Sequence, residues 1–258
     1  MIKFFRKIRK SLFEKGNFRK YSLYAIGEII LVVIGILIAL QLNNLNEKNK
    51  LAKSEVYYLE KMLTNLQEDS TELNLQLTWM NAILSEIDTS FYMLQDKSHF
   101  KHDEFVGNLS ALIKFIRFYQ NDAVYQNLIA SGKIDLISNK ELIDLLFHYY
   151  DPAYSYKSWD EGANHYTLNV LGPFLLNTAE IKIDGKHFGF PLGKLAHEIT
   201  QSERSYNSYR EDRILINYLR MKNMTLLQQK KFYTEEVMPD MINLMEIIQE
   251  EIDKKKDK

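Results

Sequence analysis

The sequence predicts an all-α protein: a single transmembrane helix that continues into a long helix and an extracytoplasmic helical bundle, with one small β-hairpin near residues 181–190. Three observations predict this class. Residues 21–40 form an apolar run as long as a bilayer is thick. Apolar residues recur at helical spacing from Ala52 to Leu94, and Asp184-Gly185 is a hairpin-turn signal between two apolar pairs.

The apolar run has Ser22 and Glu28 as its strongly polar members, and twelve of its residues are Leu, Ile or Val. A helix of this length spans about 30 Å, the thickness of a bilayer's hydrocarbon core. The aliphatic residues together outweigh the insertion cost of one acid. A buried core helix is the alternative, but such a helix rarely runs this far without a polar face. A cleaved signal peptide fits poorly, because the basic region is long and no small-residue cleavage site follows.

Charge predicts the orientation of the span. Residues 1–20 carry eight Lys or Arg and one acid, whereas the rest of the chain holds 25 basic and 33 acidic residues. Since positive residues stay in the cytoplasm, we expect a cell inner membrane protein with three parts. These are a cytoplasmic basic amphipathic arm (1–20), a transmembrane helix (21–41) and a periplasmic helical domain (42–258). The arm could bind nucleic acid, but beside a span it is better explained by topology and anionic lipid.

A long helix follows the span. Its apolar positions alternate in steps of four and three, which is typical of a coiled-coil or bundle seam, and Ser70 is the one break. The positions are Ala52, Val56, Leu59, Leu63, Leu66, Ser70, Leu73, Leu77, Met80, Leu84, Ile87, Phe91 and Leu94. The same register runs back through the span, so the span and this long helix are predicted to form one continuous helix.

The later helices are predicted from their caps and periodicity. A helix is expected over 104–119, and another after Asp122 as N-cap, with Gly132 as the residue that follows its end. Ser138 with Glu141 forms a capping-box pattern for the next helix. Two more are expected, one beginning near Tyr156 and stopped by Gly172-Pro173, and one over about 203–252 with a turn or kink at Pro239.

The one β signal is EIKIDGKHFGF. Asp184-Gly185 lies between Ile181 and Ile183 on one side and Phe188 and Phe190 on the other. This pattern predicts a hairpin with a two-residue type I′ turn. An isolated hairpin is marginally stable, so we expect it to pack on the bundle.

Two stretches carry a family resemblance. MIKFFRKIRKSLFEKGNFRKYSLYAIGEIILVVIGILIALQLNN (1–44) and DAVYQNLIASGKIDLISNKELIDLLFHYYD (122–151), with its Y-x-x-L-x-x-S-G core, resemble a family of uncharacterised bacterial single-span membrane proteins. The first contains a basic arm and a YAIGEIILVVIGILIALQ-type anchor. The resemblance implies a membrane location. The family has no known function, so it supplies no catalytic residues.

The search for chemistry finds no catalytic motif and no cofactor motif, so we expect no enzymatic activity and no cofactor. The absence of cysteine excludes disulfides and thiolate sites. His99, His102 and Asp103 are candidate metal ligands, although polar turns also collect such residues. The aromatic residues Tyr150, Tyr154 and Trp159 are a possible ligand surface, with ordinary core packing as the better-supported alternative.

Glu28 shares a helix face with four other residues of the span. On a 100° wheel these are Tyr24, Leu31, Gly35 and Ala39. The small residues Gly35 and Ala39 allow a second helix to approach closely. An acid facing lipid would be costly, so this face is predicted to contact another helix.

These observations predict a membrane-anchored helical scaffold or interaction protein of the bacterial envelope. Its expected partners are the lipid bilayer and, through the transmembrane helix, a second copy of the chain or another membrane protein. Two alternatives stay open. One is a ligand-binding sensor that relays through a membrane partner, and the other is a metal-dependent envelope enzyme.

Overall fold

The computed structural model describes residues 18–150, 156–178, 180–183, 197–200 and 204–256. The chain divides into two compact units, Met1–Val56 and Tyr57–Lys258. The described residues are mostly helical, and their strands form one two-stranded sheet. The predicted helical class is therefore confirmed. The predicted boundary after residue 41 concerns the edge of a bilayer and stays a prediction.

One helix, α2 (Phe18–Gln95), is 78 residues long. Its length follows from its sequence, because no proline occurs in it and no glycine follows Gly35. Within the stretch Ala25–Gln95, an 18-residue window has a mean hydropathy of 2.6 and is 0% buried. Among the described residues this is the one helix long and apolar enough to cross a membrane. The apolar run and the long helix that follows it do form one continuous helix, as predicted.

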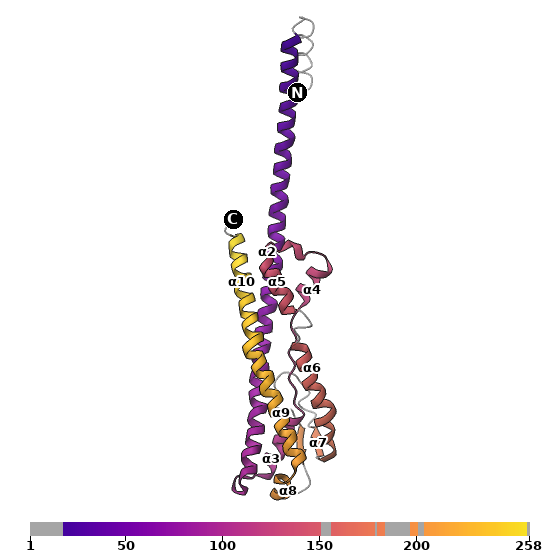
Figure 1. Ribbon diagram of the computed structural model, residues 1–258, viewed down its shortest axis with the longest axis vertical. Helices are drawn as coiled ribbons and strands as arrows, with labels where there is room; N and C mark the ends of the chain where they lie inside the picture. The colour runs from indigo at the N-terminus through magenta and orange to yellow at the C-terminus, as the bar shows by residue number, and fades with distance from the viewer. Residues whose placement is uncertain (1–17, 151–155, 179, 184–196, 201–203, 257–258) are drawn as a thin grey trace. The chain divides into compact units, whose positions relative to one another are not determined.

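In the second unit the C-terminal helices return along the later part of α2 (Figure 1). Asn223 of α9 (Arg213–Phe232) donates to Asp88 at 3.3 Å, and Lys256 of α10 (Met238–Lys256) pairs with Glu60 at 2.7 Å. As the chain proceeds from Asn223 to Lys256, its contacts on α2 move back from Asp88 to Glu60. The C-terminal helices are therefore antiparallel to α2. The other described helical elements of this unit are η1 (Lys97–His99), α3 (His102–Asn108), η2 (Leu109–Leu112), α4 (Ala123–Ala130), η3 (Ile134–Leu136), α5 (Lys140–Tyr150), α6 (Tyr156–Tyr166), η5 (Thr167–Leu171), α7 (Gly172–Thr178), α8 (Tyr206–Arg210) and η6 (Tyr233–Val237).

The buried face of α2 only partly matches the predicted seam. The shared core positions are Leu59, Leu66, Leu73, Met80, Leu84, Ile87 and Leu94. The alternate seam positions Leu63, Ser70, Leu77 and Phe91 are only partly buried. The buried positions beside them are Met62, Asp69, Ile83 and Ser90. The face is thus rotated slightly, and it contains polar residues that a search for apolar spacing does not detect.

Two π-helical turns, η5 and η6, precede prolines inside continuous helices. Pro173 follows η5 in α7, and Pro239 follows η6 in α10. A proline lacks an N–H, and its ring clashes with the carbonyl one turn earlier, so a wider turn there relieves the clash. The predicted helix stop at Gly172-Pro173 is therefore wrong: the chain stays helical to Thr178.

The caps of α4 are close to those predicted. Asp122 holds the N-cap position, although its carboxylate accepts from the Gln126 side chain at 3.1 Å instead of from a backbone N–H. Gly132 has φ +66°, the left-handed conformation that glycine adopts without steric cost. Its N–H donates to the Ile129 carbonyl at 3.1 Å, which ends the helix as predicted.

The predicted capping box before α5 is wrong by one residue. Asn139 is the cap, because its side-chain oxygen accepts from the Leu142 N–H at 3.2 Å. The Ser138 hydroxyl instead accepts from Lys255 of α10 at 2.8 Å. Asn caps a helix as well as Ser does, and the contact with α10 decides which of the two is used.

The strand β1 (Glu180–Ile183) pairs in antiparallel fashion with β2 (His197–Thr200). Ile183 lies opposite His197 in the register. The predicted hairpin with a two-residue turn at Asp184-Gly185 is therefore wrong, because the partner strand comes from farther along the chain. The predicted second strand, Phe188 to Phe190, lies outside the described residues.

Candidate functional site

The predicted helix over 104–119 is wrong in its second half. It is helical as α3 and η2, but residues 114–121 form a non-helical connecting segment. Lys114, Ile116 and Phe118 are buried, whereas Arg117 and Tyr119 are exposed. This alternation is typical of a strand. No described strand pairs with the connecting segment.

Side chains of α6 and α9 bond to one edge of the connecting segment. The Phe118 N–H donates to Asp160 Oδ2 at 2.9 Å, and Asn164 Nδ2 donates to the Ile116 carbonyl at 2.9 Å. Lys222 Nζ donates to the Lys114 carbonyl. Buried backbone N–H and C=O groups require hydrogen-bond partners. In a sheet a neighbouring strand supplies these partners, and here side chains of the helices supply them.

Side chains of α2 bond to the end of the same segment. The Asn121 N–H donates to Asp69 Oδ1 at 2.8 Å, and Asn65 Nδ2 donates to the Asn121 carbonyl at 3.1 Å. Asp69 is 2% exposed, and burial raises the pKa of its carboxyl to about 6. The Tyr149 hydroxyl lies 3.5 Å from its second oxygen. The connecting segment is therefore held from two sides.

Asp160 is the central acceptor of this network. It is 4% exposed and accepts from the Phe118 N–H, from Gln229 Nε2 and from the Tyr233 hydroxyl. Burial raises the pKa of the Asp160 carboxyl, and the hydrogen bonds oppose that rise. Both of its oxygens are engaged by protein donors. Asp160 therefore joins α6, α9, η6 and the connecting segment, and its role is to position them.

Two buried lysines lie at the start of the connecting segment. Lys114 pairs with Glu86 at 2.5 Å and lies 5.3 Å from the centre of the Trp79 ring. Lys222, 4% exposed, donates to Thr167 Oγ1 at 2.9 Å, and no described carboxylate forms an ion pair with it. Burial lowers the pKa of Lys222 to about 7. Lys222 thus connects α9 to the π-turn η5.

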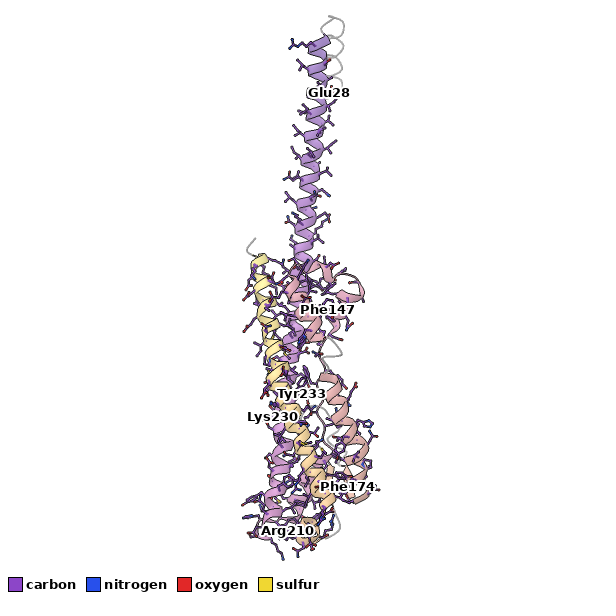
Figure 2. All side chains as sticks on the ribbon, viewed as in Figure 1. Glu28, Phe147, Phe174, Arg210, Lys230 and Tyr233 are labelled. Carbon is purple, nitrogen blue, oxygen red and sulfur yellow. The ribbon has the colours of Figure 1, made fainter. Side chains whose placement is uncertain are left out.

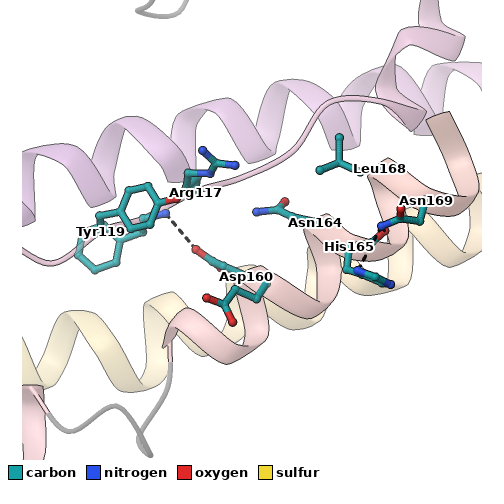
Figure 3. Close-up of a pocket in the computed structure, with 9 residues that line it drawn as sticks. Arg117, Tyr119, Asp160, Asn164, His165, Leu168 and Asn169 are labelled. Carbon is teal, nitrogen blue, oxygen red and sulfur yellow. Dashed lines mark hydrogen bonds between the residues drawn. The ribbon is translucent and has the colours of Figure 1, made fainter.

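A pocket of about 510 Å³ opens between the connecting segment and α6–η5 (Figure 3). It is lined by Arg117, Phe118, Tyr119, Asp160, Glu161, Asn164, His165, Leu168 and Asn169. In Figure 3, Arg117 and Tyr119 come from the connecting segment, and Asn164 and His165 come from α6 on the other side. The buried network of Asp160 and Asn164 holds these two walls together. The volume is in the range of small-molecule sites.

Arg117 lies beside two aromatic rings on one wall of the pocket. Its guanidinium carbon lies 5.2 Å from the centre of the Phe115 ring and 5.6 Å from that of the exposed Tyr119 ring. These are cation–π distances, so both rings stabilise the positive charge of the guanidinium. Among the described residues, Arg117 and Glu161 of the opposite wall take part in no ion pair, with each other or with another group. Arg117 and Glu161 therefore place exposed charges of opposite sign on the two walls, while the charge of Arg117 also acts on the buried Asp160 carboxylate, which lines the same pocket.

The candidate metal ligands lie just after α2, His99 in η1 and His102 and Asp103 at the start of α3. His102 Nδ1 is 3.2 Å from Asp103 Oδ1, and His99 stacks on Tyr92 with ring centres 4.3 Å apart. The buried atoms His99 Nδ1 and His102 Nε2 have no hydrogen-bond partner. In the part of the chain that the structure describes, no three His, Cys, Asp or Glu residues are grouped to hold a metal. In the described residues, His99, His102 and Asp103 are therefore not gathered into one metal-binding group.

The predicted aromatic surface is only partly visible. Tyr150 is 6% exposed and stacks on Tyr125 with ring centres 4.6 Å apart, so it belongs to the core. Tyr154 lies outside the described residues, and Trp159 is described only as part of the backbone of α6. Phe147, labelled in Figure 2, is exposed on the same helix α5 as Tyr150.

The predicted membrane-contact face lies on the first part of α2. Leu31 is 63% exposed, and a Cβ added at Gly35 would meet nothing within 4 Å. Glu28, labelled in Figure 2, is half-buried. Tyr24 is described only as part of the helix backbone, and Ala39 is exposed. In the described first unit, this face has room for another helix.

Sequence reasoning missed the polar residues that hold the connecting segment. Asp69, Asp160 and Lys222 resemble ordinary surface residues of amphipathic helices in the sequence. One signal was present: Ser70, the break in the apolar spacing of α2, is the neighbour of the buried Asp69. Arg117, by contrast, lies in a stretch predicted to be helical, so its sequence context gives no sign of a pocket.

Comparison with known proteins gives one positive result. A model described as a family of unknown function (DUF6090) matches residues 28–187, which is more than half of the 258 residues. No curated protein and no solved structure matches the chain significantly. The match includes most of the apolar span, the connecting segment and the pocket. The chain belongs to this family of unknown function, DUF6090.

Proposed function

We propose that the protein is a single-span protein of the inner membrane whose helical second unit lies in the periplasm and acts as a scaffold. The observation that carries this proposal is the window of mean hydropathy 2.6 in α2, none of which is buried. A helix this apolar, left uncovered, requires lipid or other helices around it. The second unit has its own core, so it can present a surface while the span anchors it.

The contact through which this scaffold associates is the face with Glu28, Gly35 and Ala39. Glu28 in the span would be costly against lipid and is stabilised by facing a polar group or backbone of a neighbouring helix. The small residues permit close approach. The partner is a second copy of this chain or another membrane protein.

Crosslinking in native membranes tests this association. Glu28→Leu and Gly35→Leu should each weaken it, because they remove the polar contact or fill the space for the neighbouring helix. Glu28→Gln should largely keep it. Val33→Leu, on the opposite side of the helical wheel, is the matched control.

The outcomes separate the two kinds of partner. A crosslinked species containing only this chain identifies a homo-oligomer, and mass spectrometry identifies any other partner. If both leucine variants crosslink to the same neighbours as the parent, Glu28 is not an interface residue and the proposed contact is wrong.

A second function, a ligand-binding sensor that relays through a membrane partner, is supported by the pocket between the connecting segment and α6–η5. Binding energy there can act on several helices, because Asp160 bonds to the connecting segment, α9 and η6. Isothermal titration calorimetry of the full-length protein with small-molecule libraries tests this function. If no compound binds, the sensor function is excluded while the scaffold function stands.

A further inference from the structure

The charges of the pocket indicate what kind of ligand it can hold. Arg117 projects from the connecting segment, and Glu161 from α6 lines the same pocket. Neither forms an ion pair with a described residue, although the charge of Arg117 also acts on the buried Asp160 carboxylate. A purely anionic ligand would be attracted by Arg117 and repelled by Glu161, and a purely cationic ligand would meet the reverse. A ligand that carries both charges is attracted by both walls.

Arg117 is suited to bind a carboxylate. An exposed arginine normally samples many rotamers, which costs entropy when it binds. Here Phe115 and Tyr119, two residues before and after it, lie against its guanidinium at 5.2 and 5.6 Å. Cation–π contacts stabilise the guanidinium charge, and the planar group has N–H donors suited to a bidentate contact with a carboxylate.

The opposite wall offers an anion and a mixed surface. Glu161 and His165 are four residues apart on α6, so they lie on one side of that helix. His165 Nδ1 is 3.1 Å from Asn169 Nδ2, which fixes the ring beside the pocket. Leu168 is 55% exposed and lines the same space. An ammonium group can pair with Glu161 while an apolar side chain covers Leu168.

We propose that this pocket binds a small zwitterion that carries a free carboxylate and a free ammonium group, the chemistry of an amino acid or of a short peptide. Arg117 binds the carboxylate and Glu161 binds the ammonium group. Tyr119 and Leu168 contact the side chain. The oxygens of Asp160 are already engaged by protein donors, so this residue supports the wall and does not bind the ligand. This inference rests on the sensor function and is independent of the membrane contact.

The first test is calorimetry on the full-length protein in detergent micelles. The probes are the twenty amino acids and the tripeptides trialanine and trileucine, each also as the N-acetyl and the C-amide derivative. At least one free zwitterion should bind. Its N-acetyl and its C-amide derivative should each bind at least about tenfold more weakly, because each loses one of the two charges. Comparing the affinities for amino acids with those for tripeptides shows which of the two the pocket binds.

The second test links each charge to its residue. Arg117→Met keeps the stem of the side chain and should remove the preference for the free carboxylate over the amide. Glu161→Gln should remove the preference for the free ammonium over the acetyl group. The matched controls are Arg220→Met and Glu211→Gln, which change exposed charges outside the pocket. All four positions are exposed, so the variants should fold, and circular dichroism checks this.

The inference has clear contrary outcomes. It is overturned if no zwitterion of the panel binds, or if the acetylated and amidated derivatives bind as tightly as the parent compound. It is also overturned if Arg117→Met and Glu161→Gln leave both preferences unchanged. A non-zwitterionic compound that binds in the pocket would refute the proposed ligand class and still support the sensor function.

Discussion

The Tyr233 hydroxyl lies 2.5 and 2.7 Å from the two carboxylate oxygens of Asp160, although the two residues are 73 positions apart in the chain. Both side chains are buried. The contact joins η6, the π-turn before α10, to α6, and through the Phe118 N–H it also reaches the connecting segment. One hydrogen-bonded pair thus unites three parts of the second unit.

Removing this hydroxyl should destabilise the protein. Tyr233→Phe leaves the ring in place but deprives a buried carboxylate of one donor, which costs about 1.5–3 kcal/mol of the free energy of unfolding. Urea denaturation followed by circular dichroism measures the loss. Tyr92→Phe is the control, because Tyr92 is exposed and its change should have little effect. Equal stability of the two variants would show that the Tyr233–Asp160 contact contributes nothing.

Lys222 should make stability depend on pH in the alkaline range. Its pKa is about 7 in the folded protein and 10.5 in the unfolded chain, so between these values the unfolded state binds one more proton. The free energy of unfolding should therefore rise with pH from about 7 to 9, by about 1.4 kcal/mol per pH unit from this residue.

Lys222→Met should flatten that rise, since no proton then binds on unfolding. Lys140→Met is the control, because Lys140 is exposed and should leave the pH profile unchanged. Urea denaturation at pH 7, 8 and 9 provides the comparison. A parent protein whose stability does not change with pH, or a Lys222→Met variant with the same slope as the parent, would contradict the assignment.

Two glycines should respond oppositely to alanine. Gly132 has φ +66°, and a Cβ there meets nothing within 4 Å, so Gly132→Ala is disfavoured by the backbone alone, by about 1–2 kcal/mol. Gly107 lies inside α3 with equal space around it, so Gly107→Ala should stabilise by about 0.5–1 kcal/mol. Thermal melting of both variants measures the difference. The same sign for both would refute this explanation.

The orientation of the span is also testable. Eight basic residues precede the span and the remainder of the chain has an acidic excess, so the C-terminal end should lie outside the cytoplasm. A reporter that is active only in the periplasm, fused after Lys258, should be active. Activity of a cytoplasm-only reporter at the same position would reverse the predicted topology.

Predictions from local sequence succeeded where the cause was local. The apolar run and the absence of proline predicted α2, and Gly132 predicted the end of α4. Predictions failed where two local signals competed. Ser138 and Asn139 are both good caps, and the contact of Ser138 with Lys255 decided between them. Pro173 is a helix-stop signal that the π-turn η5 overcomes.

The pocket could not be predicted because one of its walls has no local signature. Arg117 and Tyr119 lie in a stretch whose apolar spacing favours a helix. Two residues that are two positions apart face the same side only when the backbone is extended, as it is here. The hairpin failed for a related reason. Asp184-Gly185 is a turn signal, but Ile183 pairs across the sheet with His197, which is far from that turn in the sequence.

The sequence by itself determined the apolar span, the continuous helix α2 and the turn at Gly132, because spacing, composition and backbone freedom act over a few residues. The tertiary structure decided the path of residues 114–121 and with it the pocket. The physical reason is that the backbone groups of this segment bond to Asp69, Asp160 and Lys222, which are 42 to 108 positions away from the groups they contact.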